Sequence, residues 1–222
     1  MRTELDTVIN DITWAMSFFT QEGTLESLQC LINTGAVPRF TQLIDHPSMQ
    51  IAVPALRVVG NVLSSSQSAV AQVAINAGII ELFSKMIDHQ KPVMRKEVAW
   101  SLANVLAESA ERVQQCLDAG IVQSLILHLQ HDVNNVRKEC VWALTNALCR
   151  ATPQQTEAIV RQGFFTACNY ALELPDSRIM FVALEGISYA LKNGSDLPLI
   201  DGEHAFVLQV EKCGLLDKLE DL

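Results

Sequence analysis

The stretch KECVWALTNAL, residues 138–148, decides how the rest of the chain is interpreted. At about 100° per residue, its small and aliphatic side chains fall on one stripe, which is typical of a helix face packed into a core. Glu139, Trp142 and Asn146 fall on a second stripe at i, i+3 and i+7, well away from the first. An indole gains most from burial, so a Trp off the core face indicates either packing against a neighbouring helix or a binding surface.

The same layout recurs once in the sequence. In KEVAWSLANVL, residues 96–106, Glu97, Trp100 and Asn104 form the second stripe, and Val98, Leu102, Val105 and Leu106 form the core stripe. A single copy favours simple packing against a neighbouring helix. Two copies in the same phase, 42 residues apart, favour a binding surface instead.

A repeat of 42 or 43 residues runs through the chain. Four glycines in similar settings are spaced 43, 42 and 43 residues apart: Gly35, Gly78, Gly120 and Gly163. A fifth, Gly214, follows after 51 residues, so we expect an insertion of about eight residues, placed in the polar segment 193–203 after Lys192. The position that Trp100 and Trp142 hold recurs at the same interval, with spacings of 43, 43, 42 and 43. The residues at this position are Trp14, Arg57, Trp100, Trp142 and Glu185.

Each repeat is expected to contain three helices. A short helix ends at the Gly, which provides a left-handed stop, and a second helix follows. A turn leads to a longer third helix with Pro54 or Pro92 near its start. This period predicts an all-α fold, an armadillo-repeat solenoid in which three-helix repeats form a right-handed superhelix and the third helices line a concave face.

The predicted organisation is a single armadillo-repeat array over residues 1–222, with partial repeats at both ends. The repeats are expected at 1–22 (partial), 23–66, 67–108, 109–151, 152–194 and 203–222 (partial). Terminal repeats normally present a polar outer face, and these ends do not. We therefore expect either that the chain is a fragment of a longer array, or that a partner or a second copy covers its ends.

Composition excludes several functional classes. Sixteen basic and 25 acidic residues give a formal charge of −9, which disfavours nucleic acid and favours cationic partners. The uncharged stretch Val58–Ile80 contains Asn, Gln and Ser, so a membrane span is not expected, and the N-terminus lacks the apolar run of a signal peptide. The six cysteines form no CxxC pair and are interpreted as small, mostly buried residues in a reducing compartment.

We expect no enzyme activity, no cofactor and no metal. The sequence has no Gly-rich phosphate loop, HExxH or GxSxG motif. His46, His89 and His131 recur at spacings of 43 and 42, but stacked repeats would place them about 10 Å apart, too far for one metal ion. They are interpreted as turn residues at helix ends.

The Trp and Asn stripes predict a receptor for an extended basic peptide. Adjacent Trp rings form slots in which a Lys or Arg can lay its methylenes and present its charge to the ring faces. The Asn amides can bond to the peptide main chain without reading its side chains. Glu97 and Glu139, one turn before each Trp, can pair with the cationic heads, although they also fit solvated helix starts beside Lys96 and Lys138.

These motifs resemble the importin-α family, the armadillo adapters that read nuclear localisation signals. The resemblance rests on ALRVVGNVL (55–63), KEVAWSLANV, RKECVWALTNA and ALEGISYAL, with TWAMSFF (13–19) before them and QVEKCGLLDKLEDL (209–222) after them. The order Trp14, Arg57, Trp100, Trp142 also follows the family, in which one repeat carries Arg in place of Trp. The matching region is the C-terminal half of the family's array.

The resemblance implies a role for each residue of the stripe. Trp100 and Trp142 would form the slots of the minor signal-binding groove, and Asn61, Asn104 and Asn146 would hold the signal's main chain. Glu97 and Glu139 would pair with its cationic heads. Arg57 would interrupt the Trp ladder and separate the minor from the major groove, and Glu185 and Tyr189 would end the ladder.

The resemblance also implies partners and a location. Cargo proteins would bind through their basic signals, and the protein would occur in both cytoplasm and nucleus. Importin-β would bind only through an N-terminal arm that this chain lacks. Two alternatives stay open: a general armadillo scaffold that holds long acidic partners in a basic groove, and a half-array that mainly self-associates through its uncapped ends.

Overall fold

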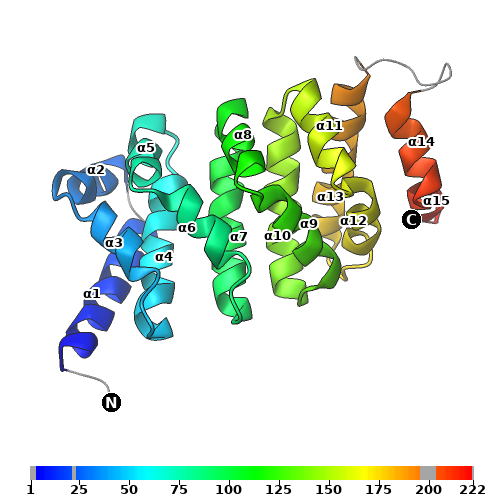
Figure 1. Cartoon of the computed structure of the whole chain (residues 1–222). Helices are drawn as coiled ribbons and strands as arrows, with labels where there is room; N and C mark the ends of the chain where they lie inside the picture. The colour runs from blue at the N-terminus through cyan, green and yellow to red at the C-terminus, as the bar shows by residue number, and fades with distance from the viewer. Residues whose placement is uncertain (1–3, 22–23, 196–203, 222) are drawn as a thin grey trace. The chain divides into compact units, whose positions relative to one another are not determined.

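The structure, a computed structural model, describes residues 4–21, 24–195 and 204–221. Every regular element in these ranges is a helix, so the all-α prediction is confirmed (Figure 1). The chain divides into two compact units, residues 1–104 and 105–222, and each is described by itself. The repeat boundaries proposed above remain a prediction.

Unit 1 contains seven helices among its described residues. The first belongs to the expected partial repeat, and the others form two sets of short, short and long helices. They are α1 (Glu4–Gln21), α2 (Leu25–Asn33), α3 (Val37–Leu43), α4 (Met49–Leu63), α5 (Ser68–Asn76), α6 (Ile79–Met86) and α7 (Pro92–Leu106), whose last two residues fall in unit 2.

Unit 2 contains two further sets of three helices and a final pair among its described residues. The helices are α8 (Ala110–Asp118), α9 (Ile121–His131), α10 (Asn134–Arg150), α11 (Pro153–Arg161), α12 (Phe164–Ala171), α13 (Ser177–Gly194), α14 (Ala205–Lys212) and α15 (Leu215–Glu220). The sequence-predicted insertion lies largely in residues 196–203, outside the described residues. Its first residues, Asn193 and Gly194, continue α13.

The repeated glycines connect the two short helices of each set. Gly78 and Gly120 have φ values of 79° and 73°, in the left-handed region that residues with a Cβ rarely adopt. No atom lies within 4 Å of where a Cβ would stand on Gly120, so backbone conformation rather than space requires glycine there. The predicted left-handed stop is therefore confirmed.

Each unit buries an apolar core between its long and short helices. In unit 1, α4 packs against α1 on one side and against α3 on another, and Ile51, Leu56 and Phe83 are fully buried. In unit 2, α10 packs against α13 and α9, around Leu125 and Leu144. Consecutive long helices therefore lie side by side within a unit, which brings equivalent positions of the repeat into contact.

Two expectations from the sequence need correction. Helix α4 begins at Met49, so Pro54 lies inside the helix rather than near its start. Of the six cysteines, Cys116, Cys140 and Cys168 are buried as expected, whereas Cys30 and Cys149 are exposed.

No single helix in the described ranges is long and apolar enough to cross a membrane. Helices α5 and α6 pass a test of length and composition when taken together, but they meet at a bend of 68°. Both contribute side chains to the core of unit 1, including Val70, Ala74 and Phe83.

Candidate functional site

The residues predicted to bind a peptide lie on three of the long helices. Helix α4 carries Arg57 and Asn61, α7 carries Glu97, Trp100 and Asn104, and α10 carries Glu139, Trp142 and Asn146. Both tryptophans are half-buried, so their rings are neither enclosed in the core nor fully exposed. A half-buried ring is held in place by its neighbours and still presents part of its surface to a ligand.

The asparagines bond to the neighbouring long helix within unit 1. Asn61 Nδ2 donates to the carbonyl of Ser17 at 3.2 Å and to Thr20 Oγ1 at 2.9 Å, and Asn104 Nδ2 donates to the carbonyl of Gly60 at 3.4 Å. Ser17 and Gly60 occupy the same position of successive repeats, 44 residues before the Asn that bonds to each. The stripe amides therefore tie adjacent long helices together, a role that the sequence did not reveal.

These bonds decide which amide atoms are left for a ligand. An Asn side chain has two N–H donors and one carbonyl acceptor. Asn61 is buried and its two donors have partners on α1, so a peptide would use its Oδ1. Asn104 is half-buried and spends one donor on Gly60, which leaves it better placed than Asn61 to both donate to and accept from a peptide.

Arg57 joins two groups of the stripe. Its guanidinium carbon lies 5.6 Å from the centre of the Trp14 ring, and its Nη2 donates to Glu97 Oε1 at 2.8 Å. The hydrogen bond to Glu97 raises the pKa of Arg57, against an opposite effect of burial. Arg57 thus makes the two contacts that the sequence assigned to a peptide cation, with an indole face and with a carboxylate.

Glu97 is buried and already has an ion-pair partner within the chain, which the sequence did not indicate. It is not a solvated helix start, because only 5% of the residue is exposed. Its carboxylate is paired with Arg57, and Lys96 Nζ lies 3.6 Å from the same oxygen. A peptide cation that used Glu97 would have to share the carboxylate with Arg57. The same ion pair also balances the charge of Arg57, which reduces the expected repulsion of a basic peptide there.

Gly60 provides space for the Trp100 ring. A Cβ on Gly60 would stand 2.3 Å from Trp100 Cζ3 and 2.7 Å from Ser101 Oγ, closer than real Cβ contacts allow. The indole therefore packs directly on the backbone of α4. Helix interiors disfavour glycine, so its presence in the middle of α4 has this packing as its physical reason.

The variant Gly60→Ala should lower the free energy of unfolding by about 1 kcal/mol. Alanine gains up to about 1 kcal/mol of helix propensity, but the overlap with the ring costs about 1–3 kcal/mol. Urea denaturation measures the net effect. In a Trp100→Ala background the same change should be less costly or stabilising, and an equal loss in both backgrounds would contradict the packing argument.

Arg178 covers the ring of Trp142 within unit 2. Its guanidinium carbon lies 5.4 Å from the centre of the ring. Asp176 caps α13 by accepting from the backbone N–H of Arg178 and Ile179 at 3.1 and 3.3 Å, and Lys138 Nζ donates to its other oxygen at 2.7 Å. The hydrogen bond from Lys138 and the backbone bonds lower the pKa of the Asp176 carboxyl. Arg178 could not be predicted from the repeat, because it lies seven residues before the repeated Trp position.

The rest of the stripe in unit 2 is half-buried. Glu139 and Asn146 both interact with other groups of the protein. On α13, Glu185 and Tyr189 stand where a further Trp and Asn would be. A hydrogen bond with Cys149 raises the pKa of Tyr189. The Trp and Asn pattern is therefore absent from α13.

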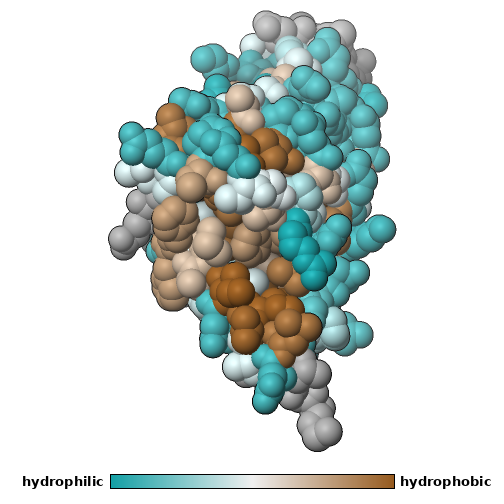
Figure 2. Space-filling model, turned by 90° about the vertical axis from the view of Figure 1, so that its left-hand side faces the viewer, coloured by the Kyte–Doolittle hydropathy of each residue, from teal (hydrophilic) through white to brown (hydrophobic). Residues whose placement is uncertain are grey.

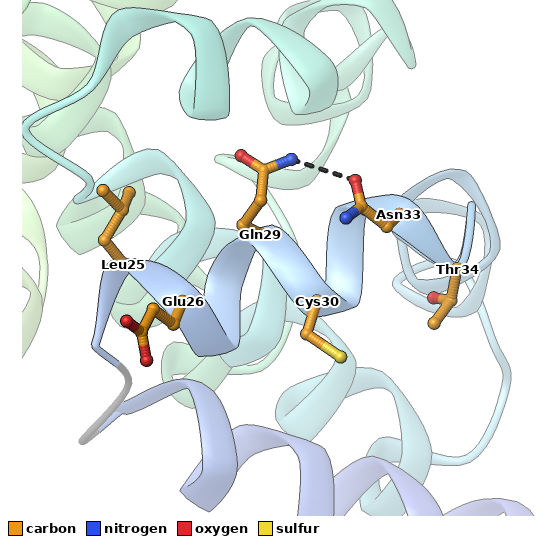
Figure 3. A pocket seen from close by; sticks show the side chains of 6 residues that line it. All are labelled: Leu25, Glu26, Gln29, Cys30, Asn33 and Thr34. Carbon is orange, nitrogen blue, oxygen red and sulfur yellow. Dashed lines mark hydrogen bonds between the residues drawn. The ribbon is translucent and has the colours of Figure 1, made fainter.

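A hollow of about 570 Å³ lies along α2 (Figure 3). All six lining residues belong to this helix or follow it directly, and none is on the Trp and Asn stripe: Leu25, Glu26, Gln29, Cys30, Asn33 and Thr34. Gln29 Nε2 donates to Asn33 Oδ1, one turn further along α2, at 3.0 Å. Within the described residues, no three His, Cys, Asp or Glu side chains form a group that could hold a metal ion.

Two repeat families match parts of the sequence. Residues 67–107 match the armadillo/beta-catenin-like repeat, and residues 92–147 match the HEAT-like repeat. The first match covers the helices α5 to α7, which carry Glu97, Trp100 and Asn104.

Curated relatives match almost the whole chain. Importin subunit alpha-4 of Arabidopsis thaliana is 34% identical over 218 residues, 97% of this chain and 40% of that protein. Importin subunit alpha-1a of Oryza sativa subsp. japonica is 31% identical over 217 residues, 97% of this chain and 41% of that protein. The chain thus spans about two fifths of the length of these relatives.

Solved structures with this fold include designed armadillo proteins. One, determined in complex with the peptide (KR)4, has a TM-score of 0.81 at 23% identity, with 98% of this chain and 84% of that chain covered. Another has a TM-score of 0.83 at 21% identity, with 100% and 87% covered. At this identity the likeness shows the armadillo fold alone.

Proposed function

Since the chain belongs to the importin-α family of armadillo-repeat proteins, we propose that it is a nuclear import adapter that binds basic nuclear localisation signals of cargo proteins. Each unit carries candidate binding residues of its own. Unit 1 contributes Trp100 and Asn104, and unit 2 contributes Trp142 and Asn146. The proposed location is the cytoplasm and nucleus, between which such an adapter carries its cargo.

The observation that carries this proposal is the pairing of arginines with tryptophans inside the chain. Arg57 stacks on Trp14, and Arg178 stacks on Trp142. Trp14 and Trp142 hold the same position of the repeat as Trp100. An indole at this position therefore accepts a guanidinium on its face, as a basic peptide would require. Each such contact contributes about 0.5–2 kcal/mol, depending on how far the cation is desolvated.

Trp100 is the best-placed ring for a peptide cation. Within the described residues of unit 1, no Lys or Arg stacks on its face, in contrast to Trp14. Gly60 fixes the position of the ring, and Asn104 stands one turn further along the same helix with one donor used. The Trp100 ring and the Asn104 amide are therefore held at a fixed distance from each other. The ring can bind a side chain of an extended peptide while the amide bonds to its main chain.

The net charge supports a basic ligand. A formal charge of −9 attracts a cationic segment over distances of about the Debye length and repels an acidic one. A general scaffold for acidic partners would need an excess of free cations along the stripe. Arg57 and Lys138 are instead paired with Glu97 and Asp176.

Titration of the chain with two peptides tests the proposal. A Lys- and Arg-rich octapeptide should bind at least about 10-fold more tightly than a Glu-rich octapeptide at about 50 mM salt, and its affinity should fall at about 300 mM salt. Tryptophan fluorescence or calorimetry gives both affinities.

Two results would decide against a signal-binding adapter. Equal affinity for both peptides at both salt concentrations would reject charge-based recognition. Tighter binding of the acidic peptide would favour the general armadillo scaffold instead.

A further inference from the structure

Unit 2 holds a cation over one of its own candidate binding residues. The guanidinium carbon of Arg178 lies 5.4 Å from the centre of the Trp142 ring, within the distance at which a Lys or Arg of a peptide would bind. The indole belongs to α10 and the arginine to α13, two long helices that pack against each other. Trp142 therefore already has the contact that a peptide cation would make with it.

Of the long helices in the described residues, α13 alone carries a cation at this place in the repeat. Arg178 directly precedes Ile179, which is buried in the core of unit 2. The residues at the same place in the other long helices are uncharged: Thr7, Gln50, Val93 and Asn135. Their spacings and that to Arg178 are 43, 43, 42 and 43, the same intervals as at the repeated Trp position. The difference between Trp142 and Trp100 thus originates in a single arginine of one repeat.

An ion pair fixes the start of α13 against α10. Lys138, one turn before Trp142 on α10, donates from Nζ to Asp176 Oδ2 at 2.7 Å. Asp176 Oδ1 accepts from the backbone N–H groups of Arg178 and Ile179 as the cap of α13. Lys138 and Asp176 are therefore positioning residues, because they hold the backbone of Arg178 beside the indole.

The side chain of Arg178 is held by the ring alone. Arg178 is exposed, and among the described residues its guanidinium has no hydrogen bond and no carboxylate partner. Arg57 differs, because its guanidinium contacts Trp14 and also donates to Glu97 Oε1 at 2.8 Å. A cation–π contact at an exposed site favours the stacked position by only about 2- to 5-fold, so a peptide cation can displace Arg178 at a modest loss of affinity.

Further helices of unit 2 support this contact, unlike the exposed side of α1. Figure 2 shows the side of the molecule on which α1 lies, with apolar side chains gathered on it. In a longer array a preceding repeat packs on such a face. Helix α10 instead packs against α9 and α13, and α13 packs against α11, α12 and α14. The contact of Arg178 with Trp142 therefore lies between helices that both have their neighbours within unit 2.

We propose that Arg178 is a specificity-determining residue of the binding surface, an internal competitor for the cations of a bound peptide; this rests on the peptide-binding function proposed above. While Arg178 covers the ring of Trp142, a Lys or Arg of the peptide loses part of the indole surface and meets a like charge. Peptide cations are therefore selected mainly at Trp100. Trp142 becomes a full binding slot only when Arg178 moves away from its ring.

A double-mutant cycle on the full chain tests this proposal. Arg178→Ala should raise the affinity for the Lys- and Arg-rich octapeptide about 3- to 10-fold, because it removes both the competing contact and the like charge. Trp142→Ala should lower that affinity about 3-fold in the parent chain and about 10-fold or more in the Arg178→Ala chain, which offers the whole ring. Calorimetric titration at low salt measures all four affinities.

Two controls separate this contact from overall charge and from folding. Arg161→Ala removes the same charge from an exposed site on α11, so it should leave the affinity within about 2-fold of the parent chain. Arg178→Ala keeps the two backbone N–H groups that Asp176 caps, so the urea midpoint should stay that of the parent chain.

The indole N–H resonances give a second measurement that does not require the loss of Trp142. The chain has three tryptophans, so single Trp→Phe variants assign all three resonances. In the parent chain the peptide should shift the Trp100 resonance more than the Trp142 resonance. In the Arg178→Ala chain both resonances should shift to a similar extent, because the peptide then reaches both rings.

Three results would overturn the role of Arg178 while the adapter function stands. The first is equal affinity of the basic peptide for the Arg178→Ala chain and the parent chain. The second is a loss on Trp142→Ala of the same size in both backgrounds. The third is a Trp142 resonance that shifts equally with and without Arg178. Failure of both chains to bind the basic peptide would instead reject the proposed function, and with it this role of Arg178.

Discussion

Replacing both Trp100 and Trp142 with alanine is expected to lower the affinity for a Lys- and Arg-rich peptide by about 100-fold, because two cation–π contacts together contribute about 1–4 kcal/mol. Trp100→Ala alone should have the larger effect of the two single changes. Arg178 already lies over the Trp142 ring, so a peptide cation has less of that ring available. Calorimetric titration of each variant with the same peptide measures the effect.

Trp14→Ala is the matched control for this experiment. Trp14 has the same place in the repeat and is half-buried like the other two tryptophans, but Arg57 stacks on its ring. Its loss should leave the peptide affinity within about 3-fold of the parent chain while it lowers stability. If the double variant also stayed within that range, Trp100 and Trp142 would not form the binding surface.

Arg57→Ala is expected to lower the free energy of unfolding by about 2 kcal/mol. Breaking a buried ion pair typically costs about 3–5 kcal/mol, because it leaves one charge buried without a partner. The cost here should be smaller, since the Arg57 side chain is 38% exposed and Lys96 remains 3.6 Å from the carboxylate. Loss of the contact with Trp14 adds to the effect. Urea denaturation of the variant measures it.

Arg39→Ala provides the control for the loss of an arginine. Arg39 is exposed on α3 and donates to Gln42 in the next turn, so its removal should change stability by less than about 0.5 kcal/mol. The double variant Arg57→Ala/Glu97→Ala should be more stable than the sum of the two single changes predicts. Strict additivity would show that the pair does not stabilise unit 1.

The fold was largely predictable because its signals are local and repeated. The left-handed glycines and the i, i+3, i+7 stripes each depend on a few neighbouring residues, and their recurrence every 42 or 43 residues indicated the armadillo family. The start of helix α4 was predicted less accurately than the repeat itself. Pro54 was expected near a helix start and lies five residues inside α4, where its missing N–H removes one backbone hydrogen bond of the helix.

Less of the candidate site was predictable, because its contacts join residues about 40 positions apart. Periodicity placed Arg57 and Glu97 on the same stripe, but it did not show that they bond to each other. Arg178 falls outside the repeat pattern altogether, and only the packing of α13 against α10 brings it over Trp142. The amides were expected to face a peptide, and two of them also bond to the preceding long helix.

The sequence by itself determined the helices, their repeat and the residues of the Trp and Asn stripe, because backbone propensity and hydrophobic period act over short distances. Only the tertiary structure decided which stripe groups are engaged. Glu97 is taken by Arg57, one face of Trp142 is taken by Arg178, and Trp100 packs on Gly60. It also showed that α1 turns its hydroxyls inward and its apolar side chains outward. These outcomes depend on the register between neighbouring helices, which a one-dimensional period does not specify.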